Sequence, residues 1–234
     1  MSAGLPFTPA SVTSIAEAIA RMEAIGAAVP AADGLGCFNR MYLEVTQQVD
    51  SQLKAGFFAD PAFLTQLDIT FANLYFEAVE AADHPLAVPL AWRPLVERRA
   101  EPGIEPIQFA LAGMNAHINH DLPLAVTGTC AALATSPAAG THLADYQKVD
   151  RLLDAAEQSV RQSFESAPEL AVDRHLQAVC DLVGSWSINS ARDVAWNNSL
   201  LLWDVRENPA ARGLLCDSLA ATTALASRML LVAV

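Results

Sequence analysis

The chain has 234 residues, enough for one large domain with a substantial hydrophobic core. Its net charge is −12, with 14 Lys plus Arg against 26 Asp plus Glu. Because phosphate-rich partners and anionic lipids need a basic surface, this balance argues against nucleic acid and against a membrane surface as partners. The sequence is 53% hydrophobic, yet it contains no uncharged apolar run long enough to span a bilayer.

The N-terminal stretch and the cysteines favour a cytoplasmic location. The residues up to Gly26 lack the basic start and apolar run of a secretory signal. The cysteines are widely separated and form no CxxC pair; they are Cys37, Cys130, Cys180 and Cys216. We therefore expect reduced thiols rather than a disulfide or zinc framework.

Hydrophobic residues recur with the period of an α-helix along most of the chain, and proline and glycine separate the periodic segments. In chain order, the predicted helices cover residues 11–28, 36–54, 61–82, 86–99, 105–126, 126–134, 144–166, 170–207 and 210–231. Alternation typical of strands is nearly absent. The sequence thus predicts an all-α fold, a single domain over residues 1–234 that forms a multi-helix bundle with a central pocket.

Two early helices contribute aromatic and acidic candidates. Tyr42 belongs to the apolar stripe of the 36–54 helix, whereas Glu44 falls outside it and reads as solvated. On the 61–82 helix, Glu77 and Tyr75 lie at opposite edges of the stripe. Glu77 either faces a pocket or lies at the rim of the core.

The 105–126 helix carries titratable residues in an apolar segment. His117 and Asp121 are four residues apart, so they lie side by side on the inward face, while His120 points further away. Gly113, one turn earlier, leaves room above the imidazole. Pro123 cannot donate a backbone hydrogen bond, so the helix is expected to bend or end there.

The 170–207 helix is expected to bring a second polar row to the core. If Leu182, Trp186 and Leu200 define its apolar stripe, then three polar residues lie within that stripe at successive turns: Asn189, Asp193 and Asn197. Buried amides and carboxylates must be hydrogen-bonded, ligate an ion, or line a wet cavity. Either the two polar rows form one shared pocket, or they are a buried network that fixes the register of the bundle.

The run around His117 resembles the signature of a family of uncharacterised helical proteins common in actinobacteria. The matching residues are Gly113, Asn115, Ala116, His117, Ile118, Asn119, Asp121, Leu122 and Pro123. The run from Ala191 to Trp196 is consistent with the same family. The resemblance implies that His117 and Asp121 matter, and names no reaction.

Two shorter runs are similar to metal-binding motifs. His117, Asp121 and the following Leu-Pro resemble a zinc-ligand run of a phospholipase C and nuclease family, but the remaining histidines do not reproduce that family's spacing. Asn189, Asp193 and Asn197 resemble the magnesium triad of class I terpene cyclases. The Asp-rich partner motif of those enzymes is missing here.

Three functions remain open from the sequence. The first is an enzyme, a secondary-metabolite cyclase or isomerase, that acts on an apolar small molecule by general acid–base catalysis without a cofactor. The second is a divalent-metal hydrolase or terpene-cyclase-like enzyme with His117, Asp121 and Asp193 as ligands. The third is a non-catalytic helical binding protein. A homodimer is compatible with each.

The candidate site residues follow from these patterns. The expected catalytic residues are His117, Asp121 and Asp193. The expected substrate-binding residues are Glu77, Trp186, Asn189, Asn197, Tyr42 and Tyr75. The central expectation is that the helices that carry His117 and Asp193 face each other across one cavity.

Overall fold

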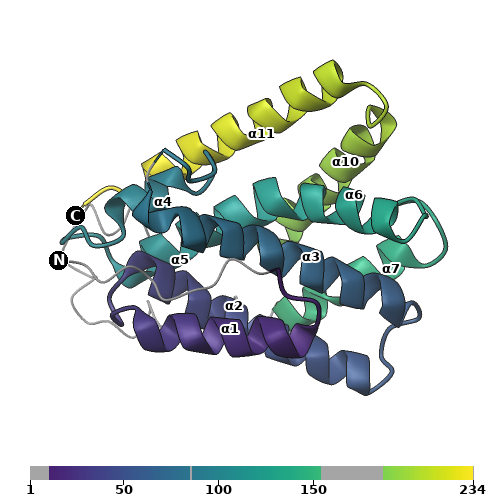
Figure 1. Cartoon of the computed structure of the whole chain (residues 1–234), viewed down its shortest axis with the longest axis horizontal. Coiled ribbons are helices and arrows are strands. Elements are labelled where there is room, and N and C mark those ends of the chain that lie inside the picture. The colour runs from purple at the N-terminus through teal and green to yellow at the C-terminus, as the bar shows by residue number, and fades with distance from the viewer. Residues whose placement is uncertain (1–10, 85, 154–186, 234) are drawn as a thin grey trace.

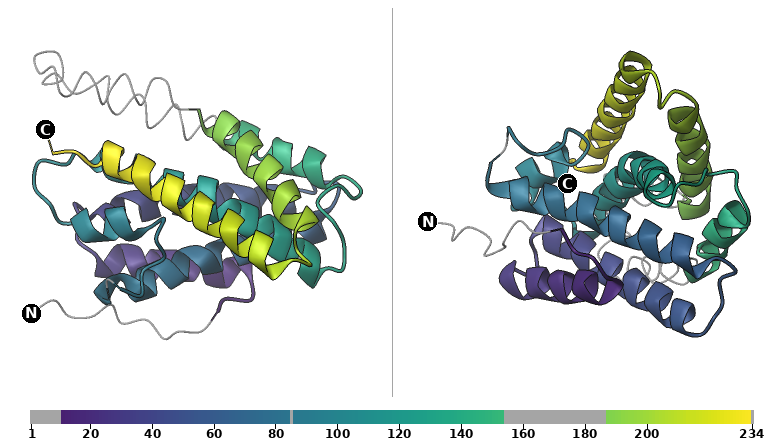
Figure 2. Two further views of the ribbon diagram at one scale, coloured as in Figure 1. Left: turned by 90° about the horizontal axis from the view of Figure 1, so that it is seen from above. Right: turned by 45° about the vertical axis from the view of Figure 1, so that its right-hand side comes forward.

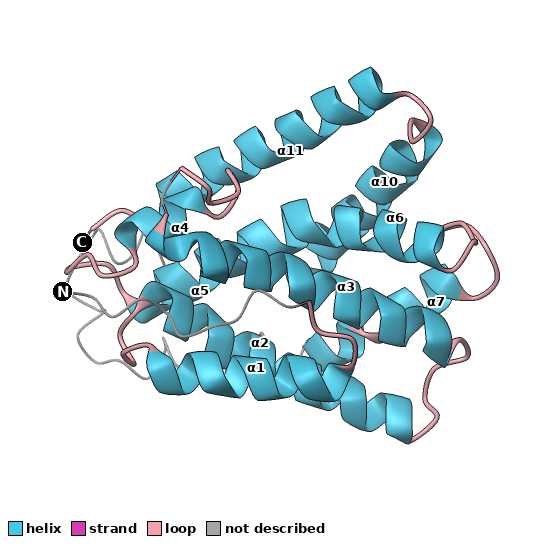
Figure 3. Ribbon diagram, in the orientation of Figure 1, coloured by secondary structure: helices cyan, strands magenta, loops and turns pink. Residues whose placement is uncertain are grey.

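A computed structural model describes residues 11–84, 86–153 and 187–233. The described residues form helices joined by loops and contain no strand (Figures 1 and 3). The helices are α1 (Ile15–Ala28), α2 (Gly34–Lys54), α3 (Pro61–Glu80), α4 (Arg93–Arg98), α5 (Pro106–Ala116), α6 (Leu122–Ala132), α7 (His142–Lys148), α10 (Ile188–Asp204) and α11 (Pro209–Leu230), with short turns η1 (Ala81–Asp83) and η2 (His117–Asp121). The predicted all-α bundle is confirmed.

The helix starts follow local capping chemistry. Polar side chains that accept a backbone N–H of the first turn begin several helices, namely Ser14, Asp33, Asp60, Ser187 and Asn208. Such caps satisfy N–H groups that have no partner within the helix. Pro61, Pro106 and Pro209 occupy the first helical turn, where a missing N–H costs nothing.

Most predicted helices appear with shifted ends. The 86–99 prediction shrinks to α4, and the 105–126 and 126–134 predictions become α5, η2 and α6 in one continuous run. Much of the predicted 144–166 and 170–207 helices lies outside the described residues. The boundaries of the single domain, 1–234, remain a prediction.

The run α5–η2–α6 lies at the centre of the bundle (Figure 2). Every residue from Ile107 to Ile118 is buried. α2 and α11 pack against α5, whereas α3 and α10 pack against α6. One core cluster of buried side chains connects the described helices.

The C-terminal helix α11 is attached to this centre through polar contacts. Asn115 donates to the carbonyl of Thr223 and to the hydroxyl of Ser227, each at 2.9 Å. Gln108 donates to the carbonyls of Leu230 and Val232. The first half of α11 is largely exposed and stands away from the bundle (Figure 1). No helix in the described ranges combines the length and apolar character needed to cross a membrane.

Gly113 allows a close contact between α5 and α2. A Cβ atom at this position would lie 2.5 Å from two carbons of the Phe38 ring. The room expected beside the imidazole is therefore filled by Phe38, whose ring centroid is 5.6 Å from that of His117.

We predict that Gly113→Ala destabilises the protein by about 1–3 kcal/mol, because the added methyl group overpacks a close contact. This corresponds to a loss of about 2–4 °C in Tm for each kcal/mol in a protein of this size. Gly213→Ala is the matched control, since a Cβ there has no neighbour within 4 Å. Equal melting curves for Gly113→Ala and the wild type would contradict the prediction.

Candidate functional site

The central helix widens at η2 to a π turn. The N–H of Leu122 donates to the carbonyl of His117, five residues earlier. Pro123 has no N–H to donate to the carbonyl of Asn119, so a regular α-helix would lose a hydrogen bond here. The helix does not end at Pro123: the π turn interrupts the α-helical pattern, and Pro123 then lies in the first turn of α6. Single π turns within α-helices are frequent at functional sites.

Asp121 is a buried carboxylate surrounded by hydrogen-bond partners. His117 Nδ1 lies 3.0 Å from Asp121 Oδ2, and Trp92 Nε1 donates to the same oxygen at 2.8 Å. His120 Nδ1 lies 2.7 Å from the other oxygen, Oδ1. A buried charge is tolerated only when such partners replace water. The i,i+4 pairing of His117 and Asp121 is as the sequence predicted.

The protonation of the pair follows from its surroundings. Burial alone would raise the pKa of Asp121, but the hydrogen bonds and charges of His117 and His120 lower it below its ordinary 3.8. Burial also lowers the pKa of His117 below 6.5, and Asp121 offsets only part of this effect. At neutral pH, Asp121 is therefore ionised and His117 is neutral. Because Asp121 accepts from Nδ1–H, the lone pair of His117 lies on Nε2.

Aromatic rings hold the imidazole in place. The Phe71 ring stacks on the His117 ring with centroids 3.4 Å apart, and the Tyr42 ring meets it edge-on at 4.4 Å. Trp92 adds a tilted contact at 5.9 Å. Together with Asp121, these contacts leave His117 little freedom to rotate.

His117 borders an apolar cavity of about 80 Å³. Within the described residues, its walls come from α2, α3, α5, η2, α6, α7, α10 and the 149–153 segment. The lining residues are Phe38, Met41, Tyr42, Val45, Val49, Leu64, Leu67, Asp68, Phe71, Met114, His117, Ile118, Leu122, Tyr146, Val149, Leu153, Ile188 and Arg192. Its volume is several times the ~10–15 Å³ that one water requires.

Two polar atoms of lining residues are buried without a hydrogen-bond partner in the described structure, His117 Nε2 and Asp68 Oδ2, whereas the Tyr42 hydroxyl interacts with Thr46. Each such group costs roughly 1–3 kcal/mol if it is left unpaired. Their occurrence at one cavity marks it as the candidate site.

Asp68 is a site residue that the sequence analysis missed. Burial, assisted by the charge of Asp50, raises the pKa of Asp68 to about 7. Asp68 is therefore partly protonated at neutral pH and can donate a hydrogen bond. One signal was present in the sequence: Asp68 lies between Leu64 and Ala72, each four residues away and buried.

Arg192 is a second missed residue. The guanidinium is buried, pairs with the Asp150 carboxylate, and donates to the Tyr146 carbonyl at 2.8 Å. It also lies over the Tyr146 ring, 4.1 Å from the centroid, and the Tyr146 hydroxyl donates to the Arg192 carbonyl. This network joins α7 to α10 at one end of the cavity.

The inward direction predicted for the polar row of α10 is wrong. Asp193 and Asn197 are exposed and Asn189 is only partly buried, whereas Arg192 faces the cavity. The prediction assumed one helix through residues 170–207. Instead, α10 begins after Ser187, whose extended backbone ends any helical phase carried from Leu182 or Trp186. Trp186 itself lies outside the described residues.

Of the other predicted residues, one lies where it was expected and the rest do not. Tyr42 lines the cavity as expected. Tyr75 is buried but does not line the cavity, and its hydroxyl donates to Asn39 Oδ1. Glu77 is exposed, so its expected place in the pocket is wrong. His120 was expected to point away, yet it contacts Asp121.

The ligand set expected for a metal is not assembled in the described structure. His117 and Asp121 are buried side by side, whereas Asp193 is exposed. In residues 11–84, 86–153 and 187–233, no group of three or more His, Cys, Asp or Glu side chains is arranged to hold an ion.

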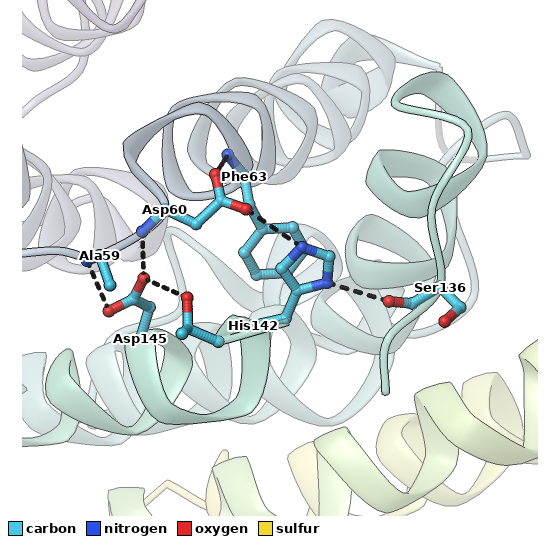
Figure 4. Close-up of polar contacts among 7 residues, drawn as sticks. Ala59, Asp60, Phe63, Ser136, His142 and Asp145 are labelled. Carbon is cyan, nitrogen blue, oxygen red and sulfur yellow. Dashed lines mark hydrogen bonds and ion pairs between the residues drawn. The ribbon is translucent and has the colours of Figure 1, made fainter. Parts of the chain in front are cut away.

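A second buried histidine provides a useful contrast (Figure 4). The ring of His142 stacks on Phe63, Nδ1 lies 2.9 Å from the Ser136 carbonyl, and Nε2 lies 3.3 Å from Asp60 Oδ2. Asp145 accepts the N–H groups of Ala59 and Asp60 nearby. Both nitrogens of His142 thus have protein partners, which is typical of a structural histidine, whereas Nε2 of His117 has none among the described residues.

The fold and this site define a helical-bundle protein with a buried carboxylate–imidazole pair at an apolar cavity. The chain belongs to a family of unknown function, DUF5995, whose model matches residues 15–233. The expected membership in a family without an assigned activity is confirmed at that level. No curated protein and no solved structure matches the chain.

We predict that Asp68→Asn changes the pH dependence of stability. Because the pKa of Asp68 is about 7 in the folded protein and near 3.8 when exposed, the folded state binds more protons between these values. The stability that Asp68 contributes therefore falls as pH rises through this interval and levels off above pH 7, whereas Asn remains neutral. The Tm of the variant relative to the wild type should rise by a few degrees over this range.

Asp217→Asn, at an exposed position on α11, is the matched control. Thermal melts of both variants and the wild type at several pH values test the prediction. A constant difference in Tm between Asp68→Asn and the wild type would show that Asp68 titrates normally.

Proposed function

We propose that this protein is an enzyme that acts on a small apolar molecule by general acid–base catalysis. The base is Nε2 of His117 and the acid is Asp68. One observation carries the proposal: the side chain of His117, held in orientation by Asp121, lines an apolar cavity, and its Nε2 is buried without a partner in the described structure. A general base needs a lone pair that no protein donor occupies and a fixed geometry.

The two groups have complementary proton affinities at neutral pH. A neutral His117 can accept a proton, while an Asp68 with a pKa of about 7 can donate one. Two titratable groups whose surroundings shift their proton affinities in this way are typical of acid and base pairs. Asp121 acts as a positioning residue that stabilises the imidazolium formed during the reaction.

The reaction class that fits is a proton transfer within one substrate. His117 removes a proton from a carbon or oxygen atom, and Asp68 delivers a proton to another atom of the same molecule. The product then has the formula of the substrate, and proton return from His117 to Asp68 through solvent restores the enzyme. More specifically, we propose that the enzyme is an isomerase or a cyclase of secondary metabolism.

The alternatives draw less support from the described residues. The metal-dependent enzyme requires Asp193 beside His117, and Asp193 is exposed. A non-catalytic binding protein would use the same cavity without proton transfer, so the experiment must separate binding from turnover.

The test uses a substrate-independent measurement of proton transfer. Metabolite extract is incubated with the purified protein in D₂O, and mass spectrometry detects compounds that gain deuterium or change retention time. We expect such a compound with the wild type, and a loss of at least about 100-fold in rate with His117→Ala, as removal of a general base produces.

His84→Ala is the matched control, because His84 is an exposed histidine and is not one of the residues that line the cavity. It should retain the wild-type rate. Turnover that survives in His117→Ala would show that His117 is not the base. A compound that binds the wild type and is never converted would favour the binding protein.

We further predict a bell-shaped pH dependence of kcat/KM for the compound so identified. The acid limb falls below pH 6.5, where His117 becomes protonated, and the basic limb falls near pH 7, where Asp68 loses its proton. Asp68→Asn should be strongly impaired, and its residual activity should lack the basic limb. A basic limb that is unchanged in Asp68→Asn would assign it to another group.

A further inference from the structure

The unpaired atoms at the cavity specify the hydrogen bonds that a ligand must supply. His117 Nε2 carries a lone pair and can only accept, because Nδ1–H is engaged with Asp121. Asp68, a second lining residue, also has an oxygen without a partner among the described residues, and the Tyr42 hydroxyl lies in the same lining beside Thr46. A phenolic hydroxyl and a protonated carboxyl can each donate. A ligand that satisfies this set must therefore donate to His117 and accept from a neighbouring group.

The remaining surface of the cavity specifies a largely apolar ligand. Apart from these groups, the described lining consists of aliphatic and aromatic side chains together with Tyr146 and Arg192. A ligand of several carbon atoms would remove this surface from water, which is favourable by about 25 cal/mol per Å². Its polar part is thus limited to the side that faces His117.

The charges around the cavity argue against an anionic ligand. Arg192 supplies the one Lys or Arg side chain of the described lining, and Asp150 already neutralises it. The guanidinium also lies against the Tyr146 ring and donates to the Tyr146 carbonyl. A carboxylate or phosphate would therefore enter a place with no uncompensated positive charge among the described residues.

The size of the cavity limits the ligand further. About 80 Å³ corresponds to roughly five to eight times the ~10–15 Å³ needed by one water. A molecule, or a terminal group of a larger molecule, with about that number of heavy atoms would fill it. A single aromatic or alicyclic ring with one substituent has this size.

We propose that the cavity binds an uncharged ring compound through one hydroxyl group, which donates a hydrogen bond to His117 Nε2. The ring packs against the apolar walls, and the hydroxyl oxygen accepts from a polar group beside His117. This substrate class rests on the proposed function, because it occupies the same cavity, but it requires binding and not turnover.

The experiment compares four probes of nearly equal size by isothermal titration calorimetry at pH 7. Phenol carries the hydroxyl, toluene replaces it with a methyl group, benzoate is anionic, and benzylamine is cationic. We expect phenol to bind at least about tenfold more tightly than toluene, because toluene leaves His117 Nε2 unpaired. Benzoate and benzylamine should bind more weakly than phenol.

Two variants connect the preference to this cavity. In His117→Leu, phenol and toluene should bind within about threefold of each other, since the acceptor is gone. In Val45→Phe, a larger side chain in the lining should weaken both probes to a similar degree. Glu44→Gln, at the neighbouring exposed position of α2, is the control and should retain the wild-type preference.

Each result of the comparison decides the proposal. Equal affinities of phenol and toluene for the wild type, tighter binding of benzoate or benzylamine, or no binding of any probe would overturn it. If His117→Leu does not fold, the four wild-type affinities and Val45→Phe still decide. A phenol preference without any turnover in D₂O would leave the ligand class standing and remove the catalytic function. Turnover that depends on His117, without tighter binding of phenol than of toluene, would leave the catalytic function standing and remove the ligand class.

Discussion

The burial of the Asp121 carboxylate is the constraint on which the site depends. An ionised carboxylate in the core must be compensated by hydrogen-bond donors, and here the donors come from two parts of the chain. His117 and His120 approach from its own turn of the helix, and Trp92 approaches from the start of α4. These contacts fix the imidazole ring, its tautomer and the position of α4 together. Loss of the charge at Asp121 would therefore disturb the fold and the site at once.

The cavity combines this fixed base with a different kind of carboxyl group. Asp121 is held ionised by its donors, whereas burial keeps Asp68 near its point of half-protonation at neutral pH. The pKa values of two aspartates within one bundle are thus shifted in opposite directions. Asp121 is surrounded by donors, whereas Asp68 has an oxygen without a partner among the described residues. The apolar surroundings strengthen both pKa shifts, because they exclude water that would otherwise screen the charges.

The sequence predicted the architecture better than the site. Helical periodicity and capping residues are local signals, so the all-α fold, most helices and the His117–Asp121 pair were accessible from them. The direction of the α10 polar row was not, because the prediction carried one helical phase through Ser187, and Ser187 is the N-cap at which α10 begins. Asp68 and Arg192 were not among the candidates, because periodicity along a single helix does not show which side chains line a cavity between helices. Their role depends on which helices meet across the cavity, which is a property of the tertiary fold.

The π turn at η2 has a consequence for how one helix can serve two sets of neighbours. A π turn contains one residue more than an α-turn, and one residue corresponds to a rotation of about 100° around the helix axis. The side chains of α6 are thus out of phase with those of α5, so α5 faces α2 and α11 while α6 faces α3 and α10. Deletion of a single residue from this turn would restore the regular phase. It would also swing the whole of α6 away from the partners that its sequence is built to meet.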